Sequence, residues 1–105
     1  MQKRIIWSEF AETQLDDIFD YYKNKASSAI ATKLIRGIIN APKKLLKAPF
    51  IGKEEELLKN RKDQYRFLVF KNYKLIYSVD QEESLIKIVD VFDARQNPIK
   101  LKRTE

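Results

Sequence analysis

Two arginines stand where a side chain could bind a phosphate or a carboxylate. Arg66 lies in an alternating run of aromatic and aliphatic residues that is typical of a β-strand, and Arg95 follows the last such run. An arginine fixed on a strand can hold an oxyanion through its planar fork, or it can form an ordinary cross-strand ion pair with an acid such as Asp90. Both interpretations stay open for Arg66. Arg95 is better placed to reach a partner, because functional residues concentrate on loops.

The residue types that are missing restrict the chemistry further. The sequence contains no His and no Cys, which removes the usual general base near neutral pH, thiolate nucleophiles, thiolate metal sites and disulfides. Any catalysis must therefore use Lys, Arg, Tyr, Asp or Glu. No glycine-rich phosphate loop, nucleophile elbow or metal-ligand spacing occurs, so we expect neither a metal nor a cofactor.

Tyrosines alternate with cations in the second half of the chain. Tyr65, Tyr73 and Tyr77 are interleaved with Arg66 and Lys74, a combination that single-stranded RNA-binding sheets use to stack bases. Strand propensity and core packing also demand such aromatics, and we favour that structural interpretation. The acidic run of residues 54–56 is interpreted as a solvated helical turn, because adjacent carboxylates point in different directions on any regular element.

Length and charge bound the class of protein. The chain has 105 residues, 44% of them hydrophobic, which predicts a single domain over residues 1–105 with a real core. No apolar run is long enough to cross a bilayer and the start lacks the apolar stretch of a signal peptide, so we expect a cytoplasmic protein. The net charge is +6, and residues 33–47 carry five basic side chains and no acidic one. Partners that carry negative charge are favoured.

The first half of the chain predicts a strand followed by a helical hairpin. Lys3–Trp7 is β-branched and aromatic, as expected of a strand, and Ser8 can cap a helix over Glu9–Lys25. Ser27 or Ser28 can cap a second helix, and the short break before it makes the two helices antiparallel. Pro42 should kink this helix or start a new one capped by Asn40. The apolar stripe of the second helix consists of Ala31, Leu34, Ile35 and Ile38, with Leu45 and Leu46 beyond.

The second half predicts a three-stranded meander. Residues 48–63 contain Pro, Gly and many charges without a clean period, so we expect a long connection outside the core. Gln64–Phe70, Tyr73–Asp80 and Ser84–Phe92 then read as strands. The order β-α-α-β-β-β predicts an α+β fold in which the helical hairpin packs on one face of an antiparallel sheet. The other face has no remaining element to cover it, and we expect it to be open to a partner.

The ordered set of these residues resembles the RelE/ParE superfamily of toxins from bacterial type II toxin-antitoxin, or plasmid stabilisation, modules. The likeness covers nearly the whole chain and agrees with the architecture predicted above. It rests on Trp7-Ser8, Ala11, Leu15, Ile18, Tyr22, Pro49, Gly52, the strands Tyr65–Val69 and Tyr73–Tyr77, and the segment Ile88–Pro98.

The resemblance implies a growth-arresting toxin, a cognate antitoxin as partner, and either DNA gyrase or the ribosome with its mRNA as target. RelE-like toxins cleave mRNA, and by position Arg66 and Arg95 correspond to the arginines that such nucleases place around the scissile phosphate. Such nucleases often add a His or Tyr near the chain end, or a Glu base on the sheet, whereas no residue after Tyr77 is Tyr or His here and Phe92 occupies that region. We therefore prefer ParE-like poisoning of gyrase, with the ribosome-dependent endonuclease as the alternative and a non-catalytic RNA-binding module as a third possibility.

Lysines supply the remaining candidates for the site. If the chain is a nuclease, a lysine of depressed pKa could accept the 2′-hydroxyl proton, and Lys53 and Lys74 join the two arginines as catalytic candidates. For a binding surface, the expected target-binding residues are Arg66, Arg95, Lys62, Lys74 and Tyr77.

Overall fold

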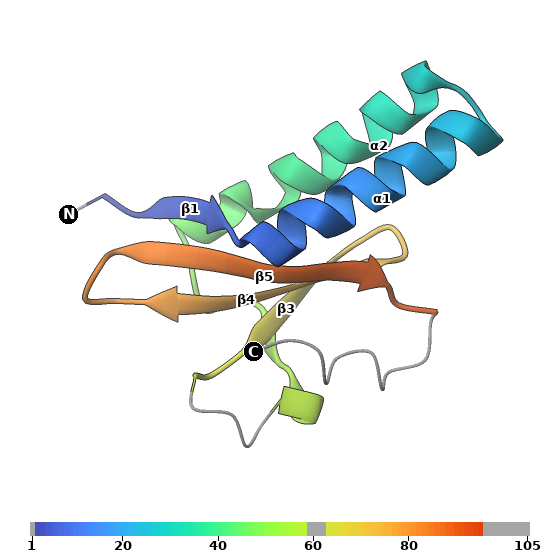
Figure 1. Cartoon of the computed structure of the whole chain (residues 1–105). Coiled ribbons are helices and arrows are strands. Elements are labelled where there is room, and N and C mark those ends of the chain that lie inside the picture. Colours follow the sequence, from blue (N-terminus) through green and yellow to red (C-terminus); the bar gives the residue numbers. More distant parts are fainter. Residues whose placement is uncertain (1, 59–62, 96–105) are drawn as a thin grey trace.

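The computed structural model describes residues 2–58 and 63–95, which form a helical hairpin stacked on a twisted sheet (Figure 1). Helix α1 spans Glu9–Lys25 and helix α2 spans Ser28–Asn40. Each begins as predicted at a serine N-cap: the Ser8 hydroxyl accepts from the Ala11 N–H and the Ser27 hydroxyl from the Ile30 N–H. None of the helices in these residues combines the length and apolarity needed to span a membrane.

The chain leaves α2 through a 3₁₀ helix, η1, over Ala41–Leu46. Pro42 lies in its first turn, where its missing N–H costs no helical hydrogen bond. The predicted fresh start at Pro42 is confirmed. The predicted cap is wrong, because Asn40 has helical backbone angles and its side chain makes no capping hydrogen bond.

Five strands form one sheet in the order β1-β5-β4-β3-β2. The predicted meander of β3, β4 and β5 is confirmed, and its neighbours pair antiparallel. β1 instead pairs parallel with β5, so the sheet is mixed, and the helical hairpin provides the crossover that a parallel pair needs. The strands are β1 Arg4–Trp7, β2 Lys53–Glu54, β3 Arg66–Phe70, β4 Tyr73–Asp80 and β5 Leu85–Asp93.

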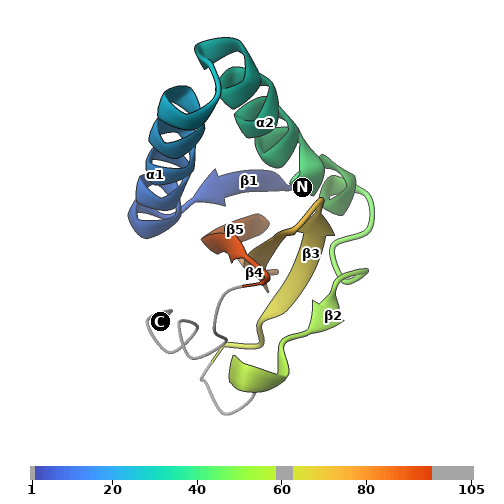
Figure 2. The ribbon, with the colours of Figure 1, turned by 90° about the vertical axis from the view of Figure 1, so that its right-hand side faces the viewer.

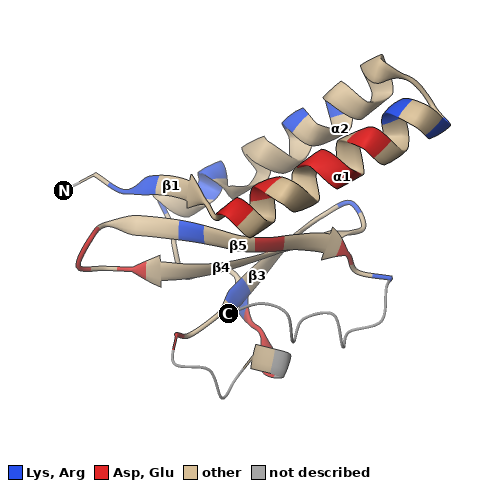
Figure 3. Cartoon of the chain, viewed as in Figure 1, with Lys and Arg blue, Asp and Glu red and all other residues tan. Residues whose placement is uncertain are grey.

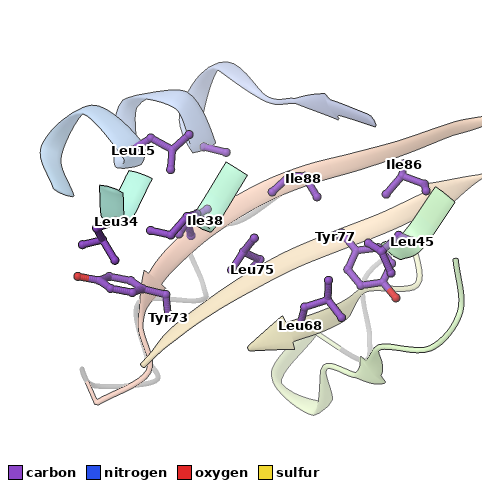
Figure 4. Close-up of a cluster of buried hydrophobic side chains, with 12 residues drawn as sticks. Leu15, Leu34, Ile38, Leu45, Leu68, Tyr73, Leu75, Tyr77, Ile86 and Ile88 are labelled. Carbon is purple, nitrogen blue, oxygen red and sulfur yellow. The ribbon is translucent and has the colours of Figure 1, made fainter. Parts of the chain in front are cut away.

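The main core lies between the hairpin and the sheet, as predicted (Figure 4). Leu15 from α1, Ile38 from α2 and Leu45 from η1 meet Leu75 and Ile88 of the two central strands. Figure 2 shows the two helices together on one side of the sheet.

The opposite face of the sheet is not fully open, contrary to the prediction. A second cluster buries Leu58, Tyr65, Ile76 and Phe92 there, and Leu58 comes from the 3₁₀ turn η2, Glu56–Leu58. The connection of residues 48–63 was expected outside the core, yet it supplies both this turn and strand β2. Sequence periodicity could not reveal this, because one leucine and a two-residue strand are too short to produce a pattern.

Candidate functional site

Arg66 lies at the start of β3, where its guanidinium holds the loop that precedes β2. Its Nη1 donates to the Gly52 carbonyl at 2.9 Å and to the Phe50 carbonyl at 3.4 Å. The guanidinium carbon also lies 5.3 Å from the centre of the Phe50 ring, within the range of a cation–π contact. Arg66 therefore has a defined structural partner in backbone carbonyls.

Tyr77 on β4 holds the same loop as Arg66, and its predicted place on a binding surface is wrong. The side chain is fully buried, so it cannot meet a macromolecular target directly. Its hydroxyl donates to the Pro49 carbonyl at 2.8 Å and accepts from the Gly52 N–H at 3.0 Å. Burial raises the pKa of Tyr77 above its ordinary value, which keeps this hydroxyl protonated as a donor.

Arg95 follows β5 and is tied to an acid on that strand. Its guanidinium forms a two-pronged ion pair with Asp93, in which Nε donates to Oδ1 at 3.0 Å and Nη2 to Oδ2 at 2.7 Å. These hydrogen bonds hold the pKa of Asp93 well below its usual range. Arg95 remains the more exposed of the two arginines, at the edge of a groove of about 510 Å³ that Tyr22 and Tyr73 also line.

The strand register places Arg66 at the start of β3 and brings Asp93, two residues before Arg95, to the level of the other end of β3. Arg66 pairs with Tyr77, whereas Asp93, two residues before Arg95, pairs with Tyr73. Four residues of a strand span about 13 Å. Arg66 lines a different groove, of about 730 Å³, with Phe50, Ser78 and Lys87. The two guanidiniums therefore do not converge on one phosphate in this structure.

Lys74 faces away from Arg66, on the side of the sheet that carries the second cluster. Its Nζ lies 2.8 Å from Oε1 of Glu55 and 4.1 Å from the centre of the Phe67 ring. Glu55 is buried, so the prediction of a solvated acidic turn at residues 54–56 is wrong for this residue. The ammonium of Lys74 neutralises a carboxylate that would otherwise be costly to bury.

The remaining candidates differ in what can be said of them. Lys53 is exposed on β2, where it pairs with Phe67, one position from the residue opposite Arg66. Lys62 lies outside the described residues. Within the described ranges no cluster of three or more metal-ligating side chains occurs.

Sequence reasoning missed Phe50 and Ile51. Both side chains are about half exposed, on the loop that Arg66 and Tyr77 hold. The available signal was a pair of large apolar residues between Pro49 and Gly52 in an otherwise charged connection.

The buried Tyr73 hydroxyl gives a prediction for alkaline pH. Burial, and then the Tyr22 hydroxyl 3.4 Å away, raise the pKa of Tyr73 well above its ordinary value near 10. The unfolded chain therefore loses this proton first, so stability is complete below pH 10 and falls as the pH rises toward the folded pKa. We expect Tyr73→Phe to reduce that fall by up to about 1.4 kcal/mol per pH unit in urea unfolding between pH 9 and 11.5. The exposed Tyr21→Phe is the control, and equal slopes for both variants would contradict the assignment.

Solved structures of bacterial toxins share this fold. The chromosomal ParDE system of P. aeruginosa matches with a TM-score of 0.73 at 19% identity, covering 90% of this chain and 98% of that chain. The RelBE2 toxin-antitoxin complex of Mycobacterium tuberculosis matches with a TM-score of 0.55 at 19% identity over 89% and 99%. The isolated RelE toxin of E. coli matches with 0.53 at 17% over 98% and 95%. At these identities the likeness establishes the fold alone.

The family is established by the sequence. Residues 5–98 match the family model described as the ParE toxin of the type II toxin-antitoxin system parDE. The chain therefore belongs to the ParE toxins, within the RelE/ParE superfamily of type II toxins. A comparison with curated proteins gives no match.

Proposed function

We propose that this toxin arrests growth by binding and poisoning DNA gyrase, and that a cognate antitoxin neutralises it. The observation that carries the choice of target is the separation of Arg66 and Arg95 along the sheet. A nuclease needs cations and a proton acceptor around one phosphate. A poison needs a binding surface and no acid–base pair.

The pKa values of two tyrosines and the contacts of Lys74 agree with this choice. Tyr73 and Tyr77 have raised pKa values, which disfavours the phenolate that a general base requires. The ammonium of Lys74 is held by Glu55. If either tyrosine hydroxyl left its partner, a buried polar group would lose its hydrogen bond.

A ribosome-dependent endonuclease is the second candidate, and one observation favours it. Lys53 is exposed on β2 and pairs with Phe67, whose ring Lys74 contacts, so these two amines lie on the same face of the sheet. In that mechanism Lys74 would stabilise the phosphate charge and Lys53 would accept the 2′-hydroxyl proton.

Two assays run in parallel decide between these targets. The purified toxin is added to DNA gyrase with relaxed plasmid, and separately to ribosomes programmed with a defined mRNA. We expect loss of supercoiling and intact mRNA. Cleavage of the mRNA at the ribosomal A site with normal supercoiling would overturn the proposal, and RNA binding with neither effect would favour a non-catalytic RNA-binding module.

Lysine-to-arginine changes test the mechanism by a second route. Arginine keeps the charge but cannot act as a base near neutral pH. We expect Lys53→Arg and Lys74→Arg to arrest growth as the wild type does, because a poison that works through surface charge is nearly indifferent to the change. A nuclease that uses one of these lysines should lose about a hundredfold in activity at that position alone.

A further inference from the structure

The segment after α2 exposes large apolar side chains beside a group of lysines. Leu46 is 42%, Phe50 45% and Ile51 53% exposed. We call the exposed side chains of this segment the η1-loop surface. It consists of Lys43, Lys44, Leu46, Lys47, Phe50 and Ile51.

This surface is held rigidly from beneath, which distinguishes it from an ordinary exposed loop. Tyr77 binds the backbone of Pro49 and Gly52, and Arg66 binds the carbonyls of Phe50 and Gly52. A Cβ at Gly52 would lie 2.5 Å from the Tyr77 hydroxyl oxygen and 2.7 Å from the Phe67 carbonyl oxygen, so the loop sits directly on the sheet. The fold therefore holds the side chains of Phe50 and Ile51 in place while about half of their surface stays exposed.

Charge indicates the kind of partner that fits. The basic run of residues 33–47 contains no acid and leads along α2 and η1 to the loop. In Figure 3, acidic segments line α1 instead. Beside Phe50 the surface is acidic instead, because Asp63, Asp80 and Glu82 line the same groove. A partner that covers this strip therefore needs acidic side chains over the lysines of η1 and apolar side chains over Leu46, Phe50 and Ile51. A nucleic acid would satisfy the lysines but would leave the two aliphatic side chains without apolar cover.

We propose that the η1-loop surface is the docking site for an acidic, amphipathic segment of the antitoxin, and that Arg66 and Tyr77 are positioning residues for it. The proposal rests on the toxin function proposed above. A segment that folds on contact loses conformational entropy, and a preorganised surface with fixed apolar anchors reduces the total cost of binding. Phe50 is the central anchor, because aromatic side chains dominate interface energetics.

The test measures affinity of the full-length toxin for the antitoxin encoded beside it, at physiological salt. We expect Phe50→Ser to weaken binding about thirtyfold or more, whereas Tyr21→Ser, at a side chain that is also exposed but lies on α1, stays within about twofold. In cells, whatever growth arrest Phe50→Ser retains should resist neutralisation by the antitoxin. Unchanged affinity in Phe50→Ser, or an equal loss in Tyr21→Ser, would overturn the docking site.

Tyr77→Phe tests the positioning role, because it removes the hydroxyl and keeps the ring. We expect antitoxin affinity to fall about three- to tenfold, while the core variant Leu75→Val, which also lowers stability, leaves affinity unchanged. A loss that follows stability in both variants would contradict positioning.

Two further outcomes separate the surface from the function. A triple variant replaces Lys43, Lys44 and Lys47 by Glu. If it binds the antitoxin normally but is no longer retained on nucleic acid, the surface belongs to nucleic acid and the proposal is overturned. If the wild type neither arrests growth nor binds antitoxin, the toxin function itself fails, and the docking site fails with it.

Discussion

Lys74→Met should lower the free energy of unfolding by about 3 kcal/mol. The change keeps the length and apolar stem of the side chain but removes the ammonium that lies 2.8 Å from Oε1 of the buried Glu55. Removing one partner of a buried ion pair is costly because a charge stays in a poorly solvated place. The partial exposure of Lys74 keeps the expected loss at the lower end of the usual range. Urea unfolding at pH 7 measures it.

The double variant Lys74→Met with Glu55→Gln is the matched control. With both charges gone, most of the lost stability should return, because a neutral amide is far cheaper to bury than a carboxylate. A double variant as unstable as Lys74→Met would show that packing of the lysine, and not its charge, matters. The result also decides how toxicity data are read, since a Lys74 variant that unfolds loses activity whether or not Lys74 acts in the mechanism.

Gly52→Ala should be the second severe substitution, lowering the free energy of unfolding by about 3 kcal/mol. The added methyl would meet the Tyr77 hydroxyl and the Phe67 backbone carbonyl at 2.5 and 2.7 Å. Overpacking of this kind costs about 1 to 3 kcal/mol. Displacing the loop would also break two hydrogen bonds, from the Gly52 N–H to the Tyr77 hydroxyl and from the Arg66 guanidinium to the Gly52 carbonyl, at about 1 kcal/mol each. Thermal unfolding should show a drop in Tm of more than about 10 °C.

Gly37→Ala provides the comparison, because the same methyl meets a different kind of neighbour. At Gly37 the new Cβ would clash with the tip of the Phe70 ring, a side chain that is partly exposed and can move. Alanine also favours the helix by about 1 kcal/mol over glycine. We expect a change of less than about 1 kcal/mol. Equal effects at the two glycines would contradict the distinction between a rigid and a movable neighbour.

The extent to which the fold could be predicted follows from how local each signal is. The spacing of Ala11 and Leu15 and the serines at positions 8 and 27 are local, and both helices begin where these residues predict. The parallel pairing of β1 depends on residues about 80 positions away, and no local pattern reports it. The cover over the second face depends on Leu58, a single residue in a charged segment.

The site was harder to predict, because residue type does not reveal what a side chain touches. Arg66 and Arg95 were identified as prominent cations, but their partners are backbone carbonyls in one case and a neighbouring aspartate in the other. Tyrosine is a residue type that can stack on bases, but the side chain of Tyr77 lies in the core. Whether either arginine contacts a target stays a prediction.

The position of β5 in the sheet determines how late in synthesis the chain can complete its fold. β5 lies between β1 and β4, so it alone joins the N-terminal strand to the meander, although it is the last described strand to leave the ribosome. Until residues 85–93 have been added, β1 has no neighbour in the sheet and the hairpin has only part of its floor. Such long-range pairing delays folding and leaves apolar surface exposed meanwhile. A growing chain therefore completes its sheet only after β5 has been added, and a product that stops before Leu85 lacks the strand that joins β1 to β4.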